Sequence, residues 1–417
     1  MRIAFDPVEA TAAAPSRARV LQAFQSRDFR LLWTGQAISL LGDAAFIVAL
    51  GWRTFTLTGS ARSLGLVLTF QGVGVLATVL IGGALADRAD RRTMMLVSDA
   101  ARFVVIAALA TVDATGHLSI ASLAAIALVE GLATGFFTPA LGGLIPLVVD
   151  GPRLGSANAL IGIARQASFL IGPTVASLLY GFAGSTVVFA FNAASYLVSF
   201  AFVYATRPRT AERTAAEGTL REIGAGFRYV ARFPWLWLTI SLFAFVLMLQ
   251  WAPIQVLTPK LVREHYDLGV GAYGLVFSAI GAGMILGTVL FGHFNPTRRR
   301  GLTSYLIWML NSVLVIVFAL SPWYPAAVVA SFLRGICIGF GITVWETMLM
   351  QLVPQHMLSR VVSLDWFGSL GLTPFGLLLV GAISGLAPPG EIIAAGAAIS
   401  MCIIACGLFS KQIQTID

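Results

Sequence analysis

The chain has 417 residues, of which 58% are hydrophobic and only 11% are charged. Soluble domains carry about 25% charged residues, so this composition excludes an ordinary soluble globular domain. The net charge of +8 does not indicate nucleic-acid binding, because the basic residues lie in short segments between long apolar runs.

Apolar runs of about 20 residues are long enough to cross a bilayer as helices. We therefore predict an all-α membrane protein with twelve spans, at 31–55, 63–86, 94–113, 119–146, 158–181, 186–205, 235–258, 270–293, 302–320, 325–351, 362–386 and 391–409. Residues 1–29 are polar and basic, so we expect no cleavable signal peptide.

The second half of the chain repeats the first at a shift of 209 residues. The shift relates four glycines of the first half, Gly65, Gly72, Gly74 and Gly83, to Gly274, Gly281, Gly283 and Gly292. A duplicated, apolar chain is typical of a transporter with two parallel halves. The domains that we predict are a tail at 1–30, six-helix bundles at 31–205 and 235–409, a central loop at 206–234 and a tail at 410–417.

The distribution of basic residues predicts the orientation in the membrane. With both termini in the cytoplasm, the cytoplasmic segments hold 20 of the 27 lysines and arginines, the outer loops hold 4 and the spans hold 3. Cytoplasmic loops are enriched in these residues, so we expect both termini inside. Residues 226–230 of the central loop are expected to form an amphipathic helix on the membrane surface.

Ionisable residues inside spans are costly and are therefore candidates for function. Asp43 lies near the middle of the first span, with Gln36, Ser39 and Phe46 at helical spacing on the same face. We expect this face to line a central cavity. A carboxylate there can bind a proton and couple protonation to the conformation, or it can pair with an arginine of another helix.

Glu130, in the fourth span, is a second candidate for proton coupling, and Glu346, in the tenth span, is a third. Glu130 can bind a proton, select a cation or pair with an arginine, for which Arg165 and Arg334 are the nearest options inside spans. Arg334 occupies the matching region of the second half, where it can bind an anionic group of a substrate.

The charged turn after the second span is a candidate gate. Asp87, Arg88, Arg91 and Arg92 follow Gly83, and Asp99 and Arg102 lie three residues apart in the next span. At the cytoplasmic mouth, such charges can bind across the two halves in one conformation and separate in the other. The alternative is that the loop charges only fix the topology of the chain in the membrane. This interpretation explains the arginines but does not explain Asp87.

Further polar and aromatic residues inside spans suit a cavity for a large amphipathic substrate, together with Arg165 and Arg334. They are Gln250 and Trp251, just before Pro253, and Asn311. We expect Pro253 to kink its helix. No phosphate-binding loop, metal-ligand spacing or nucleophile motif is present in the sequence, so we expect neither an enzyme nor a cofactor.

The segment from Gly83 to Arg92, between the second and third spans, resembles the loop signature of the major facilitator superfamily. The resemblance covers the whole chain: twelve spans, two halves, a basic central loop and a degenerate second copy of the motif. It departs at Asp90, where the family usually has glycine; aspartate tolerates the left-handed conformation better than most residues.

Within the superfamily, the chain is similar to the bacterial efflux branch, including macrolide-type and siderophore exporters. Residues 27–33, 39–43 and 359–363 carry this likeness, and Gly172-Pro173 resembles the antiporter motif of drug exporters, although the glycines expected around it are mostly missing.

The resemblance implies a monomeric secondary active exporter of drug-like or siderophore-like molecules, as in multidrug resistance. It would exchange its substrate for protons by alternating access in a bacterial inner membrane. Its partners would be the substrate, protons and lipid, with no nucleic acid. The alternatives are a proton-coupled or facilitative uptake transporter and a non-transporting membrane receptor or scaffold.

Overall fold

The structure is a computed structural model that describes residues 21–86, 89–209, 219–294 and 296–416, and these ranges contain helices and no strand. The first half begins with the 3-10 turn Gln22–Gln25 and has a second one at Gly151–Arg153. Its helices are α2 (Arg27–Thr58), α3 (Ala61–Ala86), α4 (Arg91–Ala114), α5 (Ile120–Val148) and α6 (Leu154–Ala205). Gly184, with φ 78° and ψ −175°, breaks α6 into two crossings, because glycine adopts this backbone without steric cost.

The second half begins with the amphipathic helix α7 (Thr219–Arg232), which contains the residues 226–230 expected to be helical. The next crossing is continuous but irregular: α8 (Pro234–Val246), a π-helical turn (Leu247–Trp251), α9 (Ala252–Lys260) and another π-helical turn (Leu261–His265). The remaining helices are α10 (Val270–Phe294), α11 (Arg300–Leu320), α12 (Tyr324–Leu352), α13 (Gln355–Leu370), α14 (Thr373–Ile383), α15 (Pro389–Gly407) and the short α16 (Lys411–Thr415).

Eleven of the described helical segments are long and apolar enough to cross a membrane. The α6 segment counts twice because of its break at Gly184, which gives twelve crossings in the described part of the chain. The expectation of an all-α membrane fold is therefore confirmed. The expected kink before Pro253 takes the form of the π-helical turn Leu247–Trp251, a common cause of helix bending.

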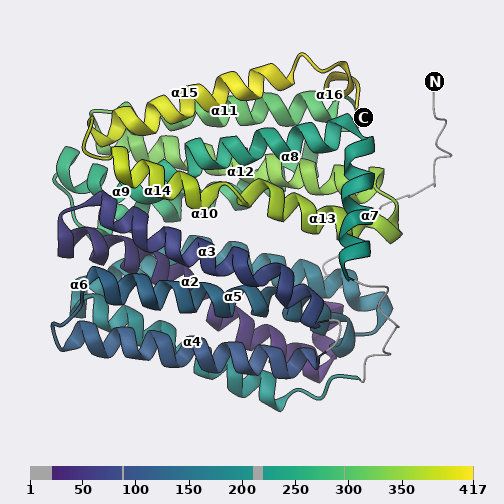
Figure 1. Ribbon diagram of the computed structural model, residues 1–417, viewed down its shortest axis with the longest axis horizontal. Coiled ribbons are helices and arrows are strands. Elements are labelled where there is room, and N and C mark those ends of the chain that lie inside the picture. The colour runs from purple at the N-terminus through teal and green to yellow at the C-terminus, as the bar shows by residue number, and fades with distance from the viewer. Residues whose placement is uncertain (1–20, 87–88, 210–218, 295, 417) are drawn as a thin grey trace.

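The helices form two bundles that lie side by side (Figure 1). Helices α2 to α6 pack together in one bundle, and α8 to α15 pack together in the other. The main contacts between the bundles are made by α6 with α10 and by α3 with α14. These contacts pair a helix of one half with a helix of the other half at two related places.

The glycines of the internal repeat explain how closely the halves approach. A Cβ atom added at Gly65 would lie 2.6 Å from the carbonyl oxygen of Leu377 in α14, and one added at Gly274 would lie 2.6 Å from that of Pro173 in α6. Small residues allow the backbones of membrane helices to touch. The duplicated sequence pattern therefore encodes two equivalent contacts between the halves.

The bundle has two ends, which we name by the chain. The terminal face is the end at which α2 begins and α15 ends, and the opposite face holds Gly59 and Gly184. Contacts between the halves concentrate toward the opposite face, where the Trp52 ring stacks on Tyr273 at 5.7 Å between centroids. Helix α7 lies at the terminal face beside α13 (Figure 1), where Gly226 approaches Leu364.

Candidate functional site

Asp43 lies in α2 at the interface with α6. The hydroxyl of Tyr196 in α6 donates a hydrogen bond of 2.6 Å to Asp43 Oδ1. Tyr196 is fully buried, so its hydroxyl needs a polar partner inside the bundle. The carboxylate of Asp43 therefore joins two helices of the first half.

The residues expected to share a cavity-lining face with Asp43 are buried in the same interface. Gln36 and Ser39 are 1% and 2% exposed, and Phe46 is 2% exposed against Phe189 of α6. Gln36 Nε2 donates a hydrogen bond of 3.2 Å to the hydroxyl of Ser199. In this conformation these side chains hold α2 against α6. They do not line the cavity between α8, α11, α12 and α13, so their role in substrate binding stays a prediction.

Asp99 and Arg102 lie one turn apart in α4 and form a buried ion pair. Arg102 Nη2 lies 2.5 Å from Asp99 Oδ1, and the Ser199 hydroxyl donates a hydrogen bond of 2.8 Å to Asp99 Oδ2. The guanidinium of Arg102 stands over the ring of Phe137 at 4.0 Å and over that of Tyr196 at 4.5 Å. The structure thus places this pair in the interior of the first bundle.

Glu130, in α5, is 6% exposed and accepts two hydrogen bonds. Gln71 Nε2 in α3 donates to Glu130 Oε2 at 2.7 Å, and the Thr134 hydroxyl donates to Oε1 at 2.8 Å. The arginine whose charge acts on Glu130 is Arg102. The sequence suggested Arg165 and Arg334 as partners of Glu130. In the structure, Arg165 is exposed and Arg334 belongs to the second bundle.

These side chains form one group, which we call the charge cluster: Asp43, Asp99, Arg102 and Glu130. The charge of Arg102 acts on all three carboxyl groups. A buried charge needs a nearby opposite charge or hydrogen bonds, and one arginine balances only one of three carboxylates. Proton binding by a carboxyl group of the cluster therefore reduces an unbalanced buried charge.

The sequence pattern did not identify Tyr196 and Gln71 as members of this site. Both are polar-tipped residues within apolar spans, which is the only signal that the sequence carries for them. Their role depends on which helices pack together, since Tyr196 faces α2 across the bundle and Gln71 faces α5.

One cavity, which we call the main cavity, has a volume of about 670 Å³ and lies in the half of the molecule nearer the terminal face. Asn158 of α6 contributes to one wall. The other walls come from α8, α11, α12 and α13 and include Phe243, Trp308, Trp345, Glu346, Asp365 and Trp366. Drug-sized ligands occupy cavities of about 300–1,000 Å³, so this space accommodates a small molecule.

Two polar contacts organise the acidic wall of the cavity. Trp345 Nε1 donates a hydrogen bond of 2.9 Å to Asp365 Oδ2, and the Ser369 hydroxyl lies 3.4 Å from Asp365 Oδ1. Glu346 is one residue after Trp345 in α12 and is exposed. The charges of Arg165 and Asp365 act on Glu346.

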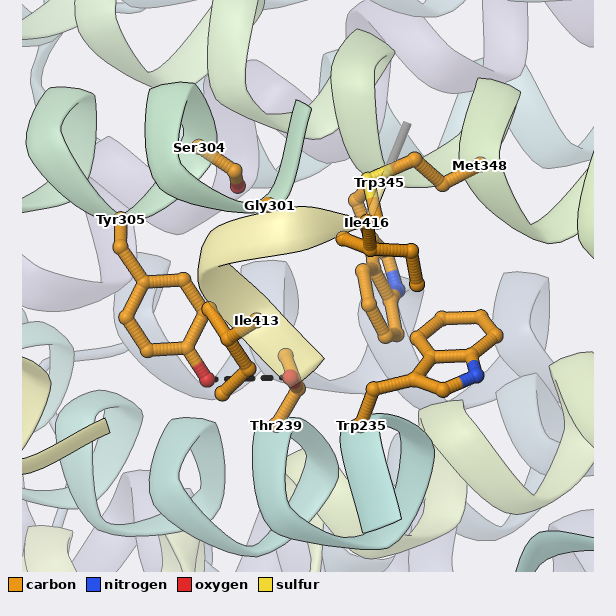
Figure 2. A pocket seen from close by; sticks show the side chains of 9 residues that line it. All are labelled: Trp235, Thr239, Gly301, Ser304, Tyr305, Trp345, Met348, Ile413 and Ile416. Atoms are coloured by element: carbon orange, nitrogen blue, oxygen red, sulfur yellow. Dashed lines mark hydrogen bonds between the residues drawn. The ribbon is translucent and has the colours of Figure 1, made fainter. Parts of the chain in front are cut away.

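The back of this wall is packed by the end of the chain. Figure 2 shows Trp345 close to Ile416 and to Trp235, whose ring meets that of Trp345 edge-on at 5.9 Å. Beside them, the hydroxyls of Thr239 and Tyr305 share a hydrogen bond of 3.0 Å. This packing fixes the indole of Trp345, and with it the orientation of Asp365.

The residues expected to bind substrate in the second bundle are mostly internal. Gln250 is 4% exposed and donates to Ser312, while Asn311 Nδ2 donates to Gln250 Oε1 at 2.7 Å. Trp251 is half-buried in the π-helical turn. Arg334 is 1% exposed and stands over the Phe318 ring at 5.6 Å. None of them lines the cavity, and their role in binding stays a prediction.

The described residues include only part of the charged turn after α3. Asp87 and Arg88 lie outside the described residues, and Gly83 is in the last turn of α3. Arg91 Nη1 donates to the carbonyl of Gly143 at 3.1 Å, and Arg92 Nε donates to that of Val203 at 3.2 Å. These two arginines thus bind helix ends of their own half in this conformation.

Asp90, which stands where the family usually has glycine, does not adopt the left-handed conformation. Its φ of −69° and ψ of 115° belong to the N-cap of α4, where its carboxylate accepts a hydrogen bond of 2.9 Å from the amide of Thr93. Partial burial opposes ionisation, but the hydrogen bonds from Thr93 lower the pKa of Asp90. At this position aspartate therefore acts as the N-cap of α4.

Gly172 and Pro173, the residues that resemble an antiporter motif, lie where α6 contacts both α2 and α10. A Cβ atom at Gly172 would collide with Ala44, the neighbour of Asp43. The carbonyl of Pro173 approaches Gly274 of α10. This short segment therefore links the surroundings of Asp43 to the contact between the halves.

Comparisons with known proteins agree with this architecture. The sequence model of the Major Facilitator Superfamily matches residues 32–372. Macrolide efflux protein A of Streptococcus pyogenes is 24% identical over 361 residues, which cover 84% of this chain and 88% of that protein. The enterobactin exporter EntS of Shigella boydii is 23% identical over 361 residues, which cover 87% and 86% of the two chains.

The fold is also similar to that of solved transporters. The crystal structure of the nucleoside transporter NupG superposes with a TM-score of 0.72 at 14% identity, over 92% of this chain and 98% of that one. The resemblance predicted from the loop motif and the repeat is confirmed, and the function is transport and not catalysis. The chain belongs to the Major Facilitator Superfamily of membrane transporters.

Proposed function

We propose that this transporter exports small amphipathic molecules across a bacterial inner membrane in exchange for protons. Two relatives that match most of the chain are named as efflux proteins, one for macrolides and one for enterobactin. The cavity of about 670 Å³, with its aromatic and apolar walls, suits a substrate of that size class.

The distribution of basic residues supports an orientation with both termini in the cytoplasm. Among the described residues, arginines are concentrated at the terminal face, at the start of α2 (Arg27 and Arg30), after α6 (Arg207 and Arg209) and at the start of α11 (Arg299 and Arg300). Cytoplasmic loops carry this excess. In that orientation the halves meet toward the outer side, and the cavity lies on the side from which an exporter collects its substrate.

The charge cluster is the observation that carries the proposed coupling to protons. Three carboxyl groups surround Arg102 in a bundle interior, where ionised groups in excess are unfavourable. Each carboxyl group accepts a hydrogen bond from another helix, and Asp43, which accepts from Tyr196 of α6, is also next to Ala44, which packs on Gly172. We assign Asp43 the proton that is exchanged for substrate, with Glu130 as a second acceptor.

The position of Asp43 connects protonation to movement of the halves. Its neighbour Ala44 packs on Gly172, and the next residue, Pro173, touches α10 of the second half at Gly274. Two turns further along α2, Trp52 stacks on Tyr273 of the same α10. A change in the contact between Asp43 and α6 is therefore transmitted to both contacts with α10, at Gly274 and at Tyr273.

The cycle then has two states related by rocking of the halves. With the cavity open outward, a proton binds Asp43 and substrate leaves; with the cavity open inward, the proton is released and substrate binds. Each inward proton supplies about 2.3 kcal/mol per 100 mV of membrane potential. Asp87 and Arg88 are proposed to stabilise one of these states across the cytoplasmic mouth.

The test is accumulation of macrolides and lipophilic dyes in an efflux-deficient bacterial host. We expect lower accumulation with the wild type than with empty vector, and loss of this difference with a protonophore or with Asp43→Asn. Glu391→Gln, which neutralises an exposed carboxylate at the start of α15, is the matched control and should export normally. Higher accumulation with the wild type would instead establish uptake.

A further inference from the structure

The walls of the main cavity carry charge of one sign. Among the described residues, the lining includes Glu346 and Asp365 and contains no lysine, arginine or histidine. Both carboxyl groups line the same cavity, and the charge of Asp365 acts on Glu346. A monovalent cation between them would relieve this repulsion, whereas an anion would add to it.

Aromatic rings stand beside these carboxyl groups. Trp345 is the hydrogen-bond partner of Asp365, and Trp366 is the next residue along α13. Trp308 and Phe243, which meet edge-on at 5.1 Å between centroids, form a further part of the wall. Tryptophan is the side chain that attracts organic cations most strongly through its ring face.

Most of the remaining lining is apolar, from residues such as Leu349, Met350, Leu358 and Val362. An inorganic cation gains nothing from apolar walls, because hard cations are bound by several oxygen ligands. A molecule with a cationic centre and a bulky apolar body would use the acidic, aromatic and apolar parts together.

Arg165 is a positive group whose charge reaches this wall. It is exposed on α6 of the first half, and its charge acts on Glu346 across the cavity. Arg165 is not part of the lining. It therefore competes with a cationic ligand for Glu346, and for an anionic ligand it would be the attractive group.

We propose that this cavity is a binding site for lipophilic organic cations, held between Glu346 and Asp365 and stacked on Trp345 and Trp366. The inference rests on the proposed export function for its physiological meaning and names the substrate class of that function. It assigns Glu346 to substrate recognition, and it adds Asp365, which the sequence pattern did not single out.

The experiment uses two ions of nearly equal size and shape and opposite charge, tetraphenylphosphonium and tetraphenylborate. Equilibrium binding of each is measured with the purified full-length protein in detergent, with protein-free micelles as the blank. No gradient is applied, so the result does not depend on the direction of transport or on protons. Failure of cation binding would thus be distinguished from failure of proton-driven export.

We expect tetraphenylphosphonium to bind at least about tenfold more tightly than tetraphenylborate. Glu346→Gln should weaken binding of the cation about tenfold, and Asp365→Asn should do the same while keeping an acceptor for Trp345. Arg165→Gln should strengthen binding of the cation, which loss of folding cannot imitate. Glu391→Gln should leave the binding of both ions unchanged.

Two results would overturn the assignment. The first is equal or tighter binding of tetraphenylborate that is weakened by Arg165→Gln, which would make the site anion-selective. The second is binding of the cation that is unchanged in both Glu346→Gln and Asp365→Asn, which would place the cation elsewhere.

Discussion

Tyr196 of α6 donates its phenolic proton to the carboxylate of Asp43 in α2, with 2.6 Å between the oxygen atoms. The same ring supports the guanidinium of Arg102 from α4 at 4.5 Å. One tyrosine therefore connects the proposed proton site to the one arginine that balances the charge cluster. Several consequences of this geometry and of its surroundings can be measured.

Tyr196→Phe removes the hydrogen bond to Asp43 and keeps the ring over Arg102. Hydrogen bonds to charged groups contribute about 1.5–3 kcal/mol, so we expect the pH at which transport is half-maximal to change, with folding retained. The measurement is the pH profile of substrate transport in membrane vesicles. Tyr204→Phe, at an exposed position, is the control, and an identical profile for both variants would contradict the role of Tyr196.

Arg102→Gln leaves the carboxyl groups of the cluster without their counter-charge. Breaking a buried ion pair by removing one partner costs about 3–5 kcal/mol, so we expect a large loss of thermal stability in detergent. Adding Asp99→Asn should recover part of that loss, because the pair is joined at 2.5 Å. If the losses of thermal stability caused by the two substitutions were additive in the double variant, the two side chains would not interact.

Gly65→Ala and Gly274→Ala place a methyl group against the backbone or side chains of the other half. We expect both changes to separate the halves on the side of the opposite face and to favour the other conformation. Single cysteines at that face, labelled by a membrane-impermeant reagent, would react faster in these variants. Gly181→Ala, which meets open space, should label at the wild-type rate.

Asp90 stabilises the start of α4 in its ionised form. Because its pKa is lowered in the folded protein, its contribution is full above the unfolded pKa of about 3.9 and is lost as pH falls through the folded pKa. Asp90→Asn still caps the helix but does not titrate. We therefore expect the melting temperature of the wild type to exceed that of Asp90→Asn at pH 7, and this difference to shrink below about pH 4.

Asp90→Ala removes the cap itself and should cost about 1 kcal/mol at pH 7 and less below about pH 4, where wild-type Asp90 is protonated. A difference between wild type and Asp90→Asn that grows on acidification would show that the carboxylate is not stabilised by Thr93. The measurement for all three proteins is thermal unfolding in the same detergent at the two pH values.

The sequence predicted the fold well because the fold depends on patterns along the chain. Span length fixes the crossings, and the glycines at a shift of 209 residues mark contacts between the halves that the structure shows at Gly65 and Gly274. Asp43 was also visible, since a carboxylate in an apolar span is rare.

The composition of the cavity was harder to predict. A polar residue in a span can face a cavity or can bond to another buried side chain, and the sequence does not distinguish these cases. Gln250 accepts a hydrogen bond from Asn311 and donates one to Ser312, so its polar atoms are satisfied without a cavity. Asp365 falls near the start of the predicted span 362–386, so the rule for ionisable residues in spans applied to it, but its place in the cavity wall beside Trp345 follows only from the structure.

The central claim is that Asp43 couples protons to export, and the most direct test uses purified protein in proteoliposomes with an imposed pH gradient and no ATP. Our account predicts that the wild type moves substrate against its concentration gradient as protons flow down theirs. Asp43→Asn should exchange substrate only down its gradient. Uphill transport by Asp43→Asn at the wild-type rate would contradict the account.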